Sequence, residues 1–209
     1  MTILFDLDGT LIDSTEAILE SFEVAYETFG EVVPDEEDIK SFIGYPLDIM
    51  FEKLGIKANK MKHVDAYKEH YRLISRSKTN LLPFAKEAIE SAARFATLGI
   101  VTTKTSKYSR ELLEHMEIMH HFDILIGRED VKNPKPHEEP ILKAMKELDS
   151  NEKSTWMIGD TVLDLQSAKN AGIKAIGVNC GYGTIKELQN YTSYVVSDTY
   201  QAVKLIKSF

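Results

Sequence analysis

The chain contains little cysteine and little proline. Among its 209 residues there is one cysteine, Cys180, and there are six prolines. A single cysteine cannot form a disulfide bond within the chain, so the sequence excludes a small scaffold held together by disulfides. We expect a cytoplasmic protein, because the sequence also shows neither a long apolar run nor the pattern of a signal peptide.

The sequence also lacks a long hydrophobic run. No apolar stretch reaches the roughly 18 residues that a membrane-spanning helix needs. The N-terminus does not show the charged and then apolar pattern of a signal peptide. We expect no membrane partner.

Positive charge is scarce relative to negative charge. The chain has 25 Lys and Arg against 33 Asp and Glu, which gives a net charge of −8 at pH 7. Phosphate backbones repel such a protein, so a nucleic-acid partner is not expected. The hydrophobic share of 43% and the charged share of 28% are ordinary for a globular protein and exclude a disordered or collagen-like chain.

The N-terminal segment and the segment that follows it have different periodicities. Residues 2–8 form a mainly apolar run that Gly9 and Thr10 end, which predicts a short buried strand before a sharp turn. From Ser14 to about Asn80, apolar residues recur at helical spacing, and no strand is evident. This segment therefore predicts an α-helical insertion after the first strand.

Short apolar runs alternate with helical patterns in the rest of the chain. These runs are Leu98–Thr103, Ile124–Gly127, Trp156–Gly159, Ala175–Val178 and Tyr194–Val196. Such alternation is typical of a doubly wound, Rossmann-like α/β fold with a parallel sheet covered on both faces. The first strand has no partner in the helical insertion, so it joins the same sheet. We predict an α/β core of residues 1–13 and 82–209, and an α-helical domain of residues 14–81.

Reactive side chains follow the predicted strands. They are Asp6 and Asp8 after the first strand, Thr102, Thr103 and Lys104 after the second, Lys135 between two prolines, and Asp160 with Asp164 after a later strand. Ligands of open parallel sheets bind beyond the carboxyl ends of the strands. Carboxylates gathered there repel one another unless a cation lies between them, and a site made only of oxygen atoms suits Mg²⁺. The pattern predicts a magnesium site and a substrate that carries phosphate.

Four segments of the chain carry a family resemblance. They are Phe5-Asp-Leu-Asp-Gly-Thr-Leu-Ile-Asp13, Val101-Thr-Thr-Lys104, Lys135-Pro136 and Gly159-Asp-Thr-Val-Leu-Asp164. In order and spacing they resemble the four motifs of the haloacid dehalogenase (HAD) superfamily, and most closely its phosphoglycolate-phosphatase-like branch, which has a helical cap after the first motif. The chain departs from the pattern after Lys135-Pro136, where a further proline is expected about two positions on but Pro140 comes later.

The resemblance implies an enzyme, a Mg²⁺-dependent phosphatase that hydrolyses a small phosphorylated metabolite through an aspartyl-phosphate. Asp6 is implied as the nucleophile and Asp8 as the general acid and base. Thr102 is implied as a hydrogen-bond donor to the phosphoryl group, and Lys135 as the group that neutralises its charge.

The same resemblance implies the ligands of the metal and of the substrate. The metal ligands are Asp6, the backbone carbonyl of Asp8, Asp160 and Asp164, the last either directly or through water. The substrate would be bound by Thr103 and Lys104 in the core and by Gly44 and Tyr45 in the cap turn Ile43–Pro46. The expected assembly is a monomer or a homodimer.

Two other functions remain open on sequence grounds. A phosphomutase resembling β-phosphoglucomutase would use the same residues and return the phosphoryl group to a bound sugar. A non-enzymatic phospho-acceptor or binding protein would keep the site without turnover.

Two further predictions concern the helical domain and the histidines. The six histidines show no metal-binding spacing, and we expect them at the surface or in loops. We expect the apolar side chains of Phe42, Met50, Phe51 and Met61 to pack between helices.

Overall fold

The computed structural model describes the whole chain, residues 1–209, which folds into two compact units. The core unit comprises Met1–Asp13 and Leu81–Phe209, and the helical unit comprises Ser14–Asn80. The chain leaves the core unit after Asp13 and returns to it at Leu81, one residue before the predicted return.

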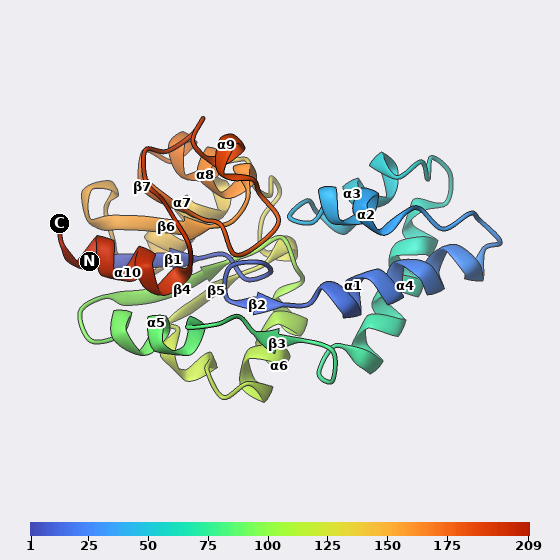
Figure 1. Ribbon diagram of the computed structural model, residues 1–209, viewed down its shortest axis with the longest axis horizontal. Helices are drawn as coiled ribbons and strands as arrows, with labels where there is room; N and C mark the ends of the chain where they lie inside the picture. The colour runs from blue at the N-terminus through green and yellow to red at the C-terminus, as the bar shows by residue number, and fades with distance from the viewer. The chain divides into compact units, whose positions relative to one another are not determined.

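A six-stranded sheet forms the centre of the core unit, in the order β5-β4-β1-β6-β7-β8 (Figure 1). Its strands are β1 (Thr2–Phe5), β4 (Thr97–Val101), β5 (Ile124–Ile126), β6 (Thr155–Gly159), β7 (Lys174–Val178) and β8 (Val195–Val196). Every neighbouring pair is parallel. The predicted parallel α/β sheet is confirmed, and β1 lies inside it, between β4 and β6.

Helices cover both faces of this sheet. They are α5 (Ala85–Ala92), α6 (Ser106–His115), α7 (Glu139–Glu147), α8 (Val162–Asn170), α9 (Ile185–Leu188) and α10 (Thr199–Lys207). Successive side chains of a strand point to opposite faces. Ile3 and Phe5 accordingly pack in the apolar cluster that includes α5 and α10, whereas Leu4 packs in the cluster that includes α7 and α8. The sheet is therefore buried on both sides, as a parallel sheet requires.

Short elements complete the core unit. The chain also contains β2 (Ile12–Asp13), β3 (Asn80–Leu81) and three 3₁₀ turns, Met119–His121, Arg128–Asp130 and Glu152–Ser154. β2 and β3 form a separate two-stranded sheet. None of the helices in the chain has both the length and the apolar character that a membrane crossing requires.

The register of the central strands decides which residues meet at the sheet edge. Phe5 of β1 lies opposite Ile100 of β4 and Ile158 of β6. The residues that follow these strand ends, Asp6, Thr102 and Asp160, consequently leave the sheet at nearly the same level.

The helical unit is built from four helices. They are α1 (Thr15–Thr28), α2 (Glu36–Ser41), α3 (Leu47–Lys53) and α4 (Lys60–Ile74). Aromatic rings join α1, α3 and α4, because the Phe22 ring centroid lies 4.7 Å from that of Phe51 and 5.0 Å from that of Tyr67. Burial of rings this large contributes much of the packing free energy of a small unit.

Two predictions about α4 are wrong. His63 is 3% exposed rather than at the surface, because it lies on the apolar face four residues before Tyr67. Its ring centroid is 4.4 Å from that of Phe29. Met61 is 56% exposed rather than packed between helices. It lies only two residues from His63, so its side chain leaves the helix on a different face.

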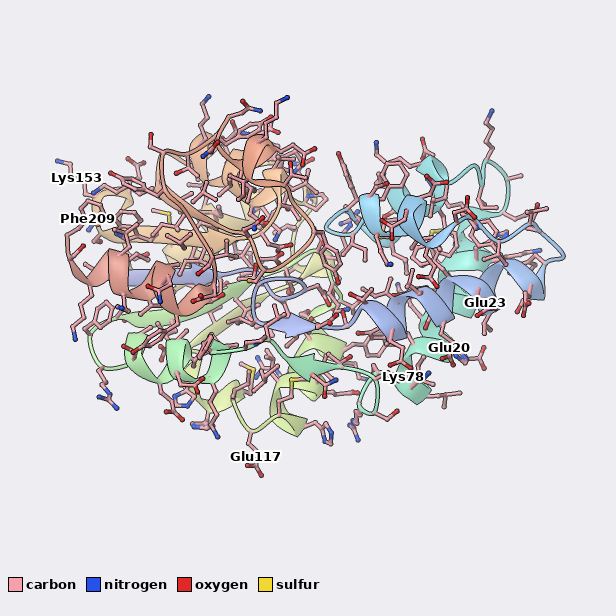
Figure 2. The ribbon with its side chains drawn as sticks, in the orientation of Figure 1. Glu20, Glu23, Lys78, Glu117, Lys153 and Phe209 are labelled. Atoms are coloured by element: carbon pink, nitrogen blue, oxygen red, sulfur yellow. The ribbon has the colours of Figure 1, made fainter.

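An ion-pair network ties α1 to the residues after α4. Figure 2 shows Glu20 on α1 and Lys78 beyond the end of α4. Lys78 forms salt bridges with Glu20 and, at 2.7 Å, with Glu16, and His70 Nε2 lies 3.0 Å from Glu20 Oε1. These groups are partly exposed, so each pair contributes little stability by itself.

Candidate active site

A tight turn after β1 presents the first pair of carboxylates. The carbonyl oxygen of Leu7 accepts hydrogen bonds from the backbone N–H groups of Thr10, Leu11 and Ile12. Gly9 has a φ of +81°, a conformation that glycine adopts without strain. Asp6 remains joined to the sheet, since its N–H donates to the Ile158 carbonyl at 2.9 Å. The turn thus places Asp6 and the residues after it at the carboxyl edge of the sheet.

Asp6 belongs to a buried ionic cluster. Lys135 Nζ lies 2.8 Å from Asp6 Oδ1 and 2.5 Å from Asp164 Oδ1, and it donates to the Val101 carbonyl at 2.9 Å. Side chains of all three charged residues are 5% exposed or less. Charge-assisted hydrogen bonds of this kind fix both the lysine and the two carboxylates in one geometry.

Charge in the cluster is unbalanced. Burial and the neighbouring charge of Asp164 raise the pKa of the Asp6 carboxyl to about 7, although Lys135 acts in the opposite direction. Burial and the charges of Asp164 and Asp6 likewise raise the pKa of Asp160 well above its usual range. Burial alone would lower the pKa of Lys135, but the charges of Asp164 and Asp6 outweigh it and raise that pKa. The cluster therefore holds three buried carboxyl groups and one ammonium group, which contacts only Asp6 and Asp164, and a further cation would relieve the repulsion between the carboxylates.

Asp160 is oriented by two donors from distant segments. Thr10 Oγ1 donates to Asp160 Oδ1 at 2.8 Å, and the Tyr182 N–H donates to Oδ2 at 2.9 Å. Two glycines leave room for this carboxylate: a Cβ atom at Gly9 would lie 2.3 Å from Oδ2, and one at Gly181 would lie 2.1 Å from it. The Asp160 side chain is consequently held in one orientation by a closely fitting pocket of backbone.

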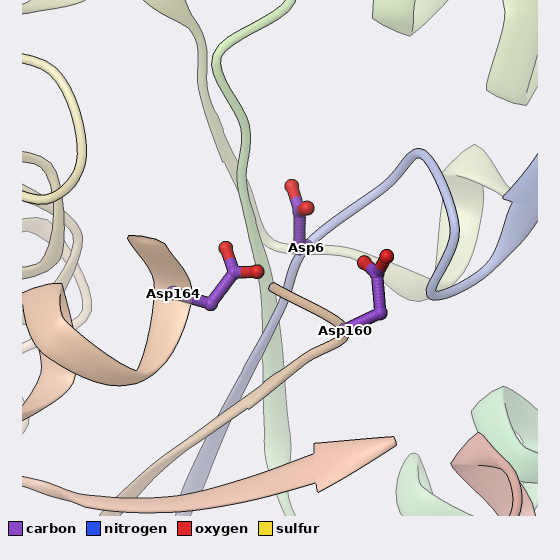
Figure 3. Close-up of side chains that lie close together, drawn as sticks. All are labelled: Asp6, Asp160 and Asp164. Atoms are coloured by element: carbon purple, nitrogen blue, oxygen red, sulfur yellow. The ribbon is translucent and has the colours of Figure 1, made fainter. Parts of the chain in front are cut away.

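The three buried carboxylates suit a hard divalent cation. One oxygen atom from each of Asp6, Asp160 and Asp164 can be chosen so that all three lie within 4.8 Å of one another. Figure 3 shows the three side chains, from the end of β1, the end of β6 and the start of α8, gathered at one place. A donor set made only of oxygen atoms is the kind that Mg²⁺ prefers. The residues present therefore fit the metal that the sequence predicts.

Asp164 already has partners for both of its oxygen atoms. Oδ1 accepts from Lys135, and Oδ2 accepts from the N–H and the hydroxyl of Thr161 at 3.0 and 2.7 Å. Asp164 is the third residue of α8, and this reciprocal contact with Thr161 is a capping box. The side chain thus fixes the start of α8 and orients Lys135.

The end of β4 supplies Thr102, Thr103 and Lys104. Thr102 is buried, and its hydroxyl oxygen accepts from the Lys104 N–H at 3.1 Å, so its hydroxyl hydrogen can be directed to another acceptor. Lys104 Nζ lies 3.2 Å from Asp8 Oδ2. Thr103, between Thr102 and Lys104 in the sequence, has a half-buried side chain. The structure therefore brings Asp8 and the β4 end together on the same side of the sheet.

Gly44 and Tyr45 lie in the helical unit, in the turn before α3. Gly44 has a φ of +107°, and the Tyr45 N–H donates to the Phe42 carbonyl at 3.1 Å. Lys53 Nζ lies 4.7 Å from the centroid of the Tyr45 ring and 5.2 Å from that of Phe42. A cation placed over two rings is held by cation–π attraction. These residues form a group of their own within the helical unit.

The groups that hold Asp160 were not predicted from the sequence. The sequence placed Thr10 only in the turn after the first strand, and it led to no prediction for Gly181 or Tyr182. The available signal was position, because Gly181 and Gly183 lie in the loop after β7, at the same carboxyl edge as Asp160. Cys180, beside this pair, donates to the Gly9 carbonyl at 3.5 Å. Burial and the charge of Asp160 raise the pKa of its thiol to about 11, so it remains a donor at neutral pH.

Comparison with known proteins gives a consistent assignment. A family model described as haloacid dehalogenase-like hydrolase matches residues 3–178. The pyrophosphatase PpaX of Anoxybacillus flavithermus is 34% identical, over 92% of this chain and 88% of its own. A phosphoglycolate phosphatase of Salmonella typhi is 28% identical, over 86% and 81%. The solved structure of a haloacid dehalogenase-like family hydrolase from Streptococcus pneumoniae has a TM-score of 0.88 at 28% identity, and the match covers 98% of this chain and 97% of that one.

Proposed function

Because the chain belongs to the haloacid dehalogenase-like hydrolase family, we propose that it is a phosphatase that hydrolyses the phosphate monoester of a small metabolite through an aspartyl-phosphate on Asp6. The observation that carries this proposal is the buried contact of Lys135 with Asp6 and Asp164, beside Asp160. A buried carboxylate with a raised pKa and a lysine partner, at the sheet edge where ligands bind, is typical of a functional site.

Asp6 is the nucleophile in the first half-reaction. Lys135 binds Oδ1, so we assign the attack on phosphorus to Oδ2. The new Asp6 oxygen–phosphorus bond forms as the bond from phosphorus to the leaving oxygen breaks, and Asp8 donates a proton to that oxygen. A weakly basic carboxylate suffices, since phosphoryl transfer through a loose transition state asks little of its nucleophile.

Asp8 changes role in the second half-reaction. It accepts a proton from a water molecule whose oxygen attacks phosphorus, and the Asp6 oxygen–phosphorus bond breaks to release inorganic phosphate. This returns both carboxyl groups to their starting state. The contact with Lys104 holds the Asp8 side chain beside the end of β4, where Thr102 can donate its hydroxyl hydrogen to a phosphoryl oxygen.

Asp6 and Asp160 would hold Mg²⁺ together with the backbone carbonyl of Asp8, and Asp164 would contribute through water or directly. When bound, the ion supplies positive charge that offsets the carboxylates and the phosphoryl oxygens. Lys135, whose ammonium contacts Asp6 Oδ1, would add to this charge. Removing one such electrostatic group typically lowers the rate by on the order of 10² to 10³.

We assign substrate choice to the helical unit, as a cap. Its turn carries Gly44 and Tyr45 with the Lys53 ammonium over the Tyr45 ring, which would suit a leaving group that bears its own negative charge. A phosphoglycolate-like ester has this chemistry, and the similarity to a phosphoglycolate phosphatase supports it. The similarity to a pyrophosphatase instead supports a leaving group whose negative charge is that of a second phosphate.

The first test replaces the nucleophile. Asp6→Asn keeps the shape of the side chain, and we expect it to abolish release of phosphate from para-nitrophenyl phosphate in the presence of Mg²⁺. Asp123→Asn is the matched control, because Asp123 is exposed and precedes β5 at the opposite edge of the sheet. Near-normal turnover by Asp6→Asn would exclude an aspartyl-phosphate at this position.

The second test identifies the leaving group. Phosphate release from 2-phosphoglycolate, pyrophosphate and sugar phosphates is compared by kcat/KM at fixed Mg²⁺. A preference for 2-phosphoglycolate supports the proposal, whereas a preference for pyrophosphate would replace it with phosphoanhydride hydrolysis. Movement of the phosphoryl group between positions of a sugar phosphate, without release of phosphate, would identify a phosphomutase.

A further inference from the structure

The N-terminus of α10 contacts the turn after β1. Thr199 is the first residue of α10 and is 2% exposed. Its hydroxyl donates to the backbone carbonyl of Thr10 at 2.6 Å, across 189 positions of sequence. Thr10 itself is fully buried, so its carbonyl cannot accept a hydrogen bond from solvent water in place of the one from Thr199.

Thr10 passes this contact on to Asp160. The backbone carbonyl of Thr10 is held by Thr199, and its side-chain hydroxyl donates to Asp160 Oδ1 at 2.8 Å. The preceding carbonyl, that of Gly9, accepts from the Cys180 thiol. Two successive carbonyls of the turn are therefore anchored by the C-terminal part of the chain, outside the four motif segments.

We infer that Thr199 is a positioning residue for the metal site: by holding the Thr10 carbonyl, it fixes the Thr10 hydroxyl that orients the Asp160 carboxylate. This inference rests on the proposed function, because it takes Asp160 as a ligand of Mg²⁺. Thr199 touches neither the substrate nor the metal, and its effect passes through Thr10.

Close packing is the reason that the effect reaches Asp160. The Gly9 backbone lies so near the carboxylate that an added Cβ atom would be 2.3 Å from Oδ2. Loss of the Thr199 hydroxyl leaves a buried carbonyl without its donor, and the turn then shifts to find another. A small shift of the turn moves both Gly9 and the Thr10 hydroxyl against Asp160. Groups that orient metal ligands in this way typically change metal affinity by about 10- to 100-fold when they are removed.

The direct test measures binding of Mg²⁺ to the purified, metal-free protein by titration calorimetry. Thr199→Val keeps the shape of the side chain and removes the hydroxyl, and we expect it to weaken Mg²⁺ binding by roughly tenfold or more. Thr199→Ser restores the hydroxyl and should restore the wild-type dissociation constant. Unchanged binding by Thr199→Val, or failure of the serine variant to rescue it, would overturn the inference.

A matched control separates positioning from general stability. Thr155 is a fully buried threonine of the same unit, and its hydroxyl donates to the Asn151 carbonyl at 2.7 Å. It lies at the start of β6, at the edge opposite the site. Thr155→Val should lower the melting temperature but leave the Mg²⁺ dissociation constant unchanged. An equal loss of Mg²⁺ affinity in this control would show that Thr199 acts only through stability.

Further variants keep the inference testable if one protein fails to fold. Thr199→Ala removes the hydroxyl without placing a methyl group against the carbonyl, and it should weaken Mg²⁺ binding as the valine variant does. If Thr199 acts through the Thr10 hydroxyl, the loss of Mg²⁺ affinity caused by Thr199→Val should be smaller in a Thr10→Val background than in the wild type, and fully additive losses would contradict that route.

The variant Asp160→Asn distinguishes the inference from the proposed function. If Asp160→Asn leaves Mg²⁺ binding intact, the proposed metal site itself is wrong. If Asp160→Asn abolishes binding and Thr199→Val does not weaken it, only the role of Thr199 is wrong.

Discussion

Lys135 Nζ and Asp6 Oδ1 lie 2.8 Å apart at the carboxyl edge of the sheet, and their side chains are 1% and 5% exposed. The two residues come from opposite ends of a long stretch of chain, one directly after β1 and the other in the loop before α7. A buried pair of this kind constrains both partners, because neither can lose the other without being left charged and desolvated.

The metal-free protein should become more stable as the pH falls from about 8 toward 5. The pKa of Asp6 is about 7 in the folded protein against 3.8 ordinarily, so in this range the folded state binds a proton that the unfolded chain does not. Asp160 shifts in the same direction. Urea unfolding at pH 8 and pH 6, without metal, measures the effect.

Asp6→Asn is the control for this pH dependence, because the amide does not titrate and the variant should respond less to pH. Burial lowers the pKa of His121, which opposes the effect as the pH falls through its usual value of 6.5. The difference between wild type and variant removes that contribution. A wild-type protein no more sensitive to pH than Asp6→Asn would contradict the assigned shift.

Lys135→Met should damage both stability and catalysis. Removing the ammonium leaves Asp6 and Asp164 buried without their common partner, a loss that typically costs about 3 to 5 kcal/mol. We expect kcat to fall by on the order of 10² to 10³ as well. Denaturant unfolding and phosphate release measure the two effects. Lys146→Met, at an exposed position of α7, should change neither, and a comparable loss there would remove the special role of Lys135.

Gly181→Ala should weaken Mg²⁺ binding. The added methyl group would lie 2.1 Å from Asp160 Oδ2 and 2.5 Å from the Gly9 carbonyl oxygen, so the carboxylate or the turn must move. Calorimetric titration with Mg²⁺ measures the loss. Gly172→Ala is the control: its φ of +73° makes alanine costly there, but the atom nearest to an added Cβ would be 3.7 Å away and belongs to Glu152. Stability should fall in the control while its Mg²⁺ affinity stays the same.

Tyr45→Ala should change the ranking among substrates more than the basal reaction. If Tyr45 and the Lys53 ammonium over its ring meet the leaving group, their loss affects substrates with a charged leaving group most. Values of kcat/KM for 2-phosphoglycolate, pyrophosphate and para-nitrophenyl phosphate measure the ranking. Tyr191→Ala, at an exposed tyrosine of the core unit, is the control. A uniform loss for all three substrates would assign Tyr45 to stability rather than to selection.

The sequence was sufficient to predict the sheet and the strand-end residues. Asp6, Thr102 and Asp160 directly follow or end apolar runs of strand length, and the parallel topology brings such residues to one edge. Lys135 was predicted from the family resemblance, and its contacts with Asp6 and Asp164 were not, because they depend on how a loop folds back over β4.

The groups that orient Asp160 could not be predicted in the same way. The Tyr182 N–H is a backbone donor, which almost any residue type would supply. Thr199 cannot be distinguished in the sequence from any other threonine near the start of a helix. His63 was misjudged for a different reason. The surface prediction followed from the polarity of histidine, whereas the position of His63 on the apolar face of α4 buries its side chain. Packing, rather than residue type, decides such positions.

The central position of β1 also sets the order in which the protein can form during synthesis. β1 precedes the other strands of this sheet in the sequence, and its hydrogen-bonding neighbours begin only at Thr97 and Thr155. The helical unit is one continuous segment, Ser14–Asn80, and can fold before the strands that pair with β1 have been synthesised. Asp6 is therefore made long before its final surroundings are complete, because these also require Thr199, which is 193 positions further along the chain.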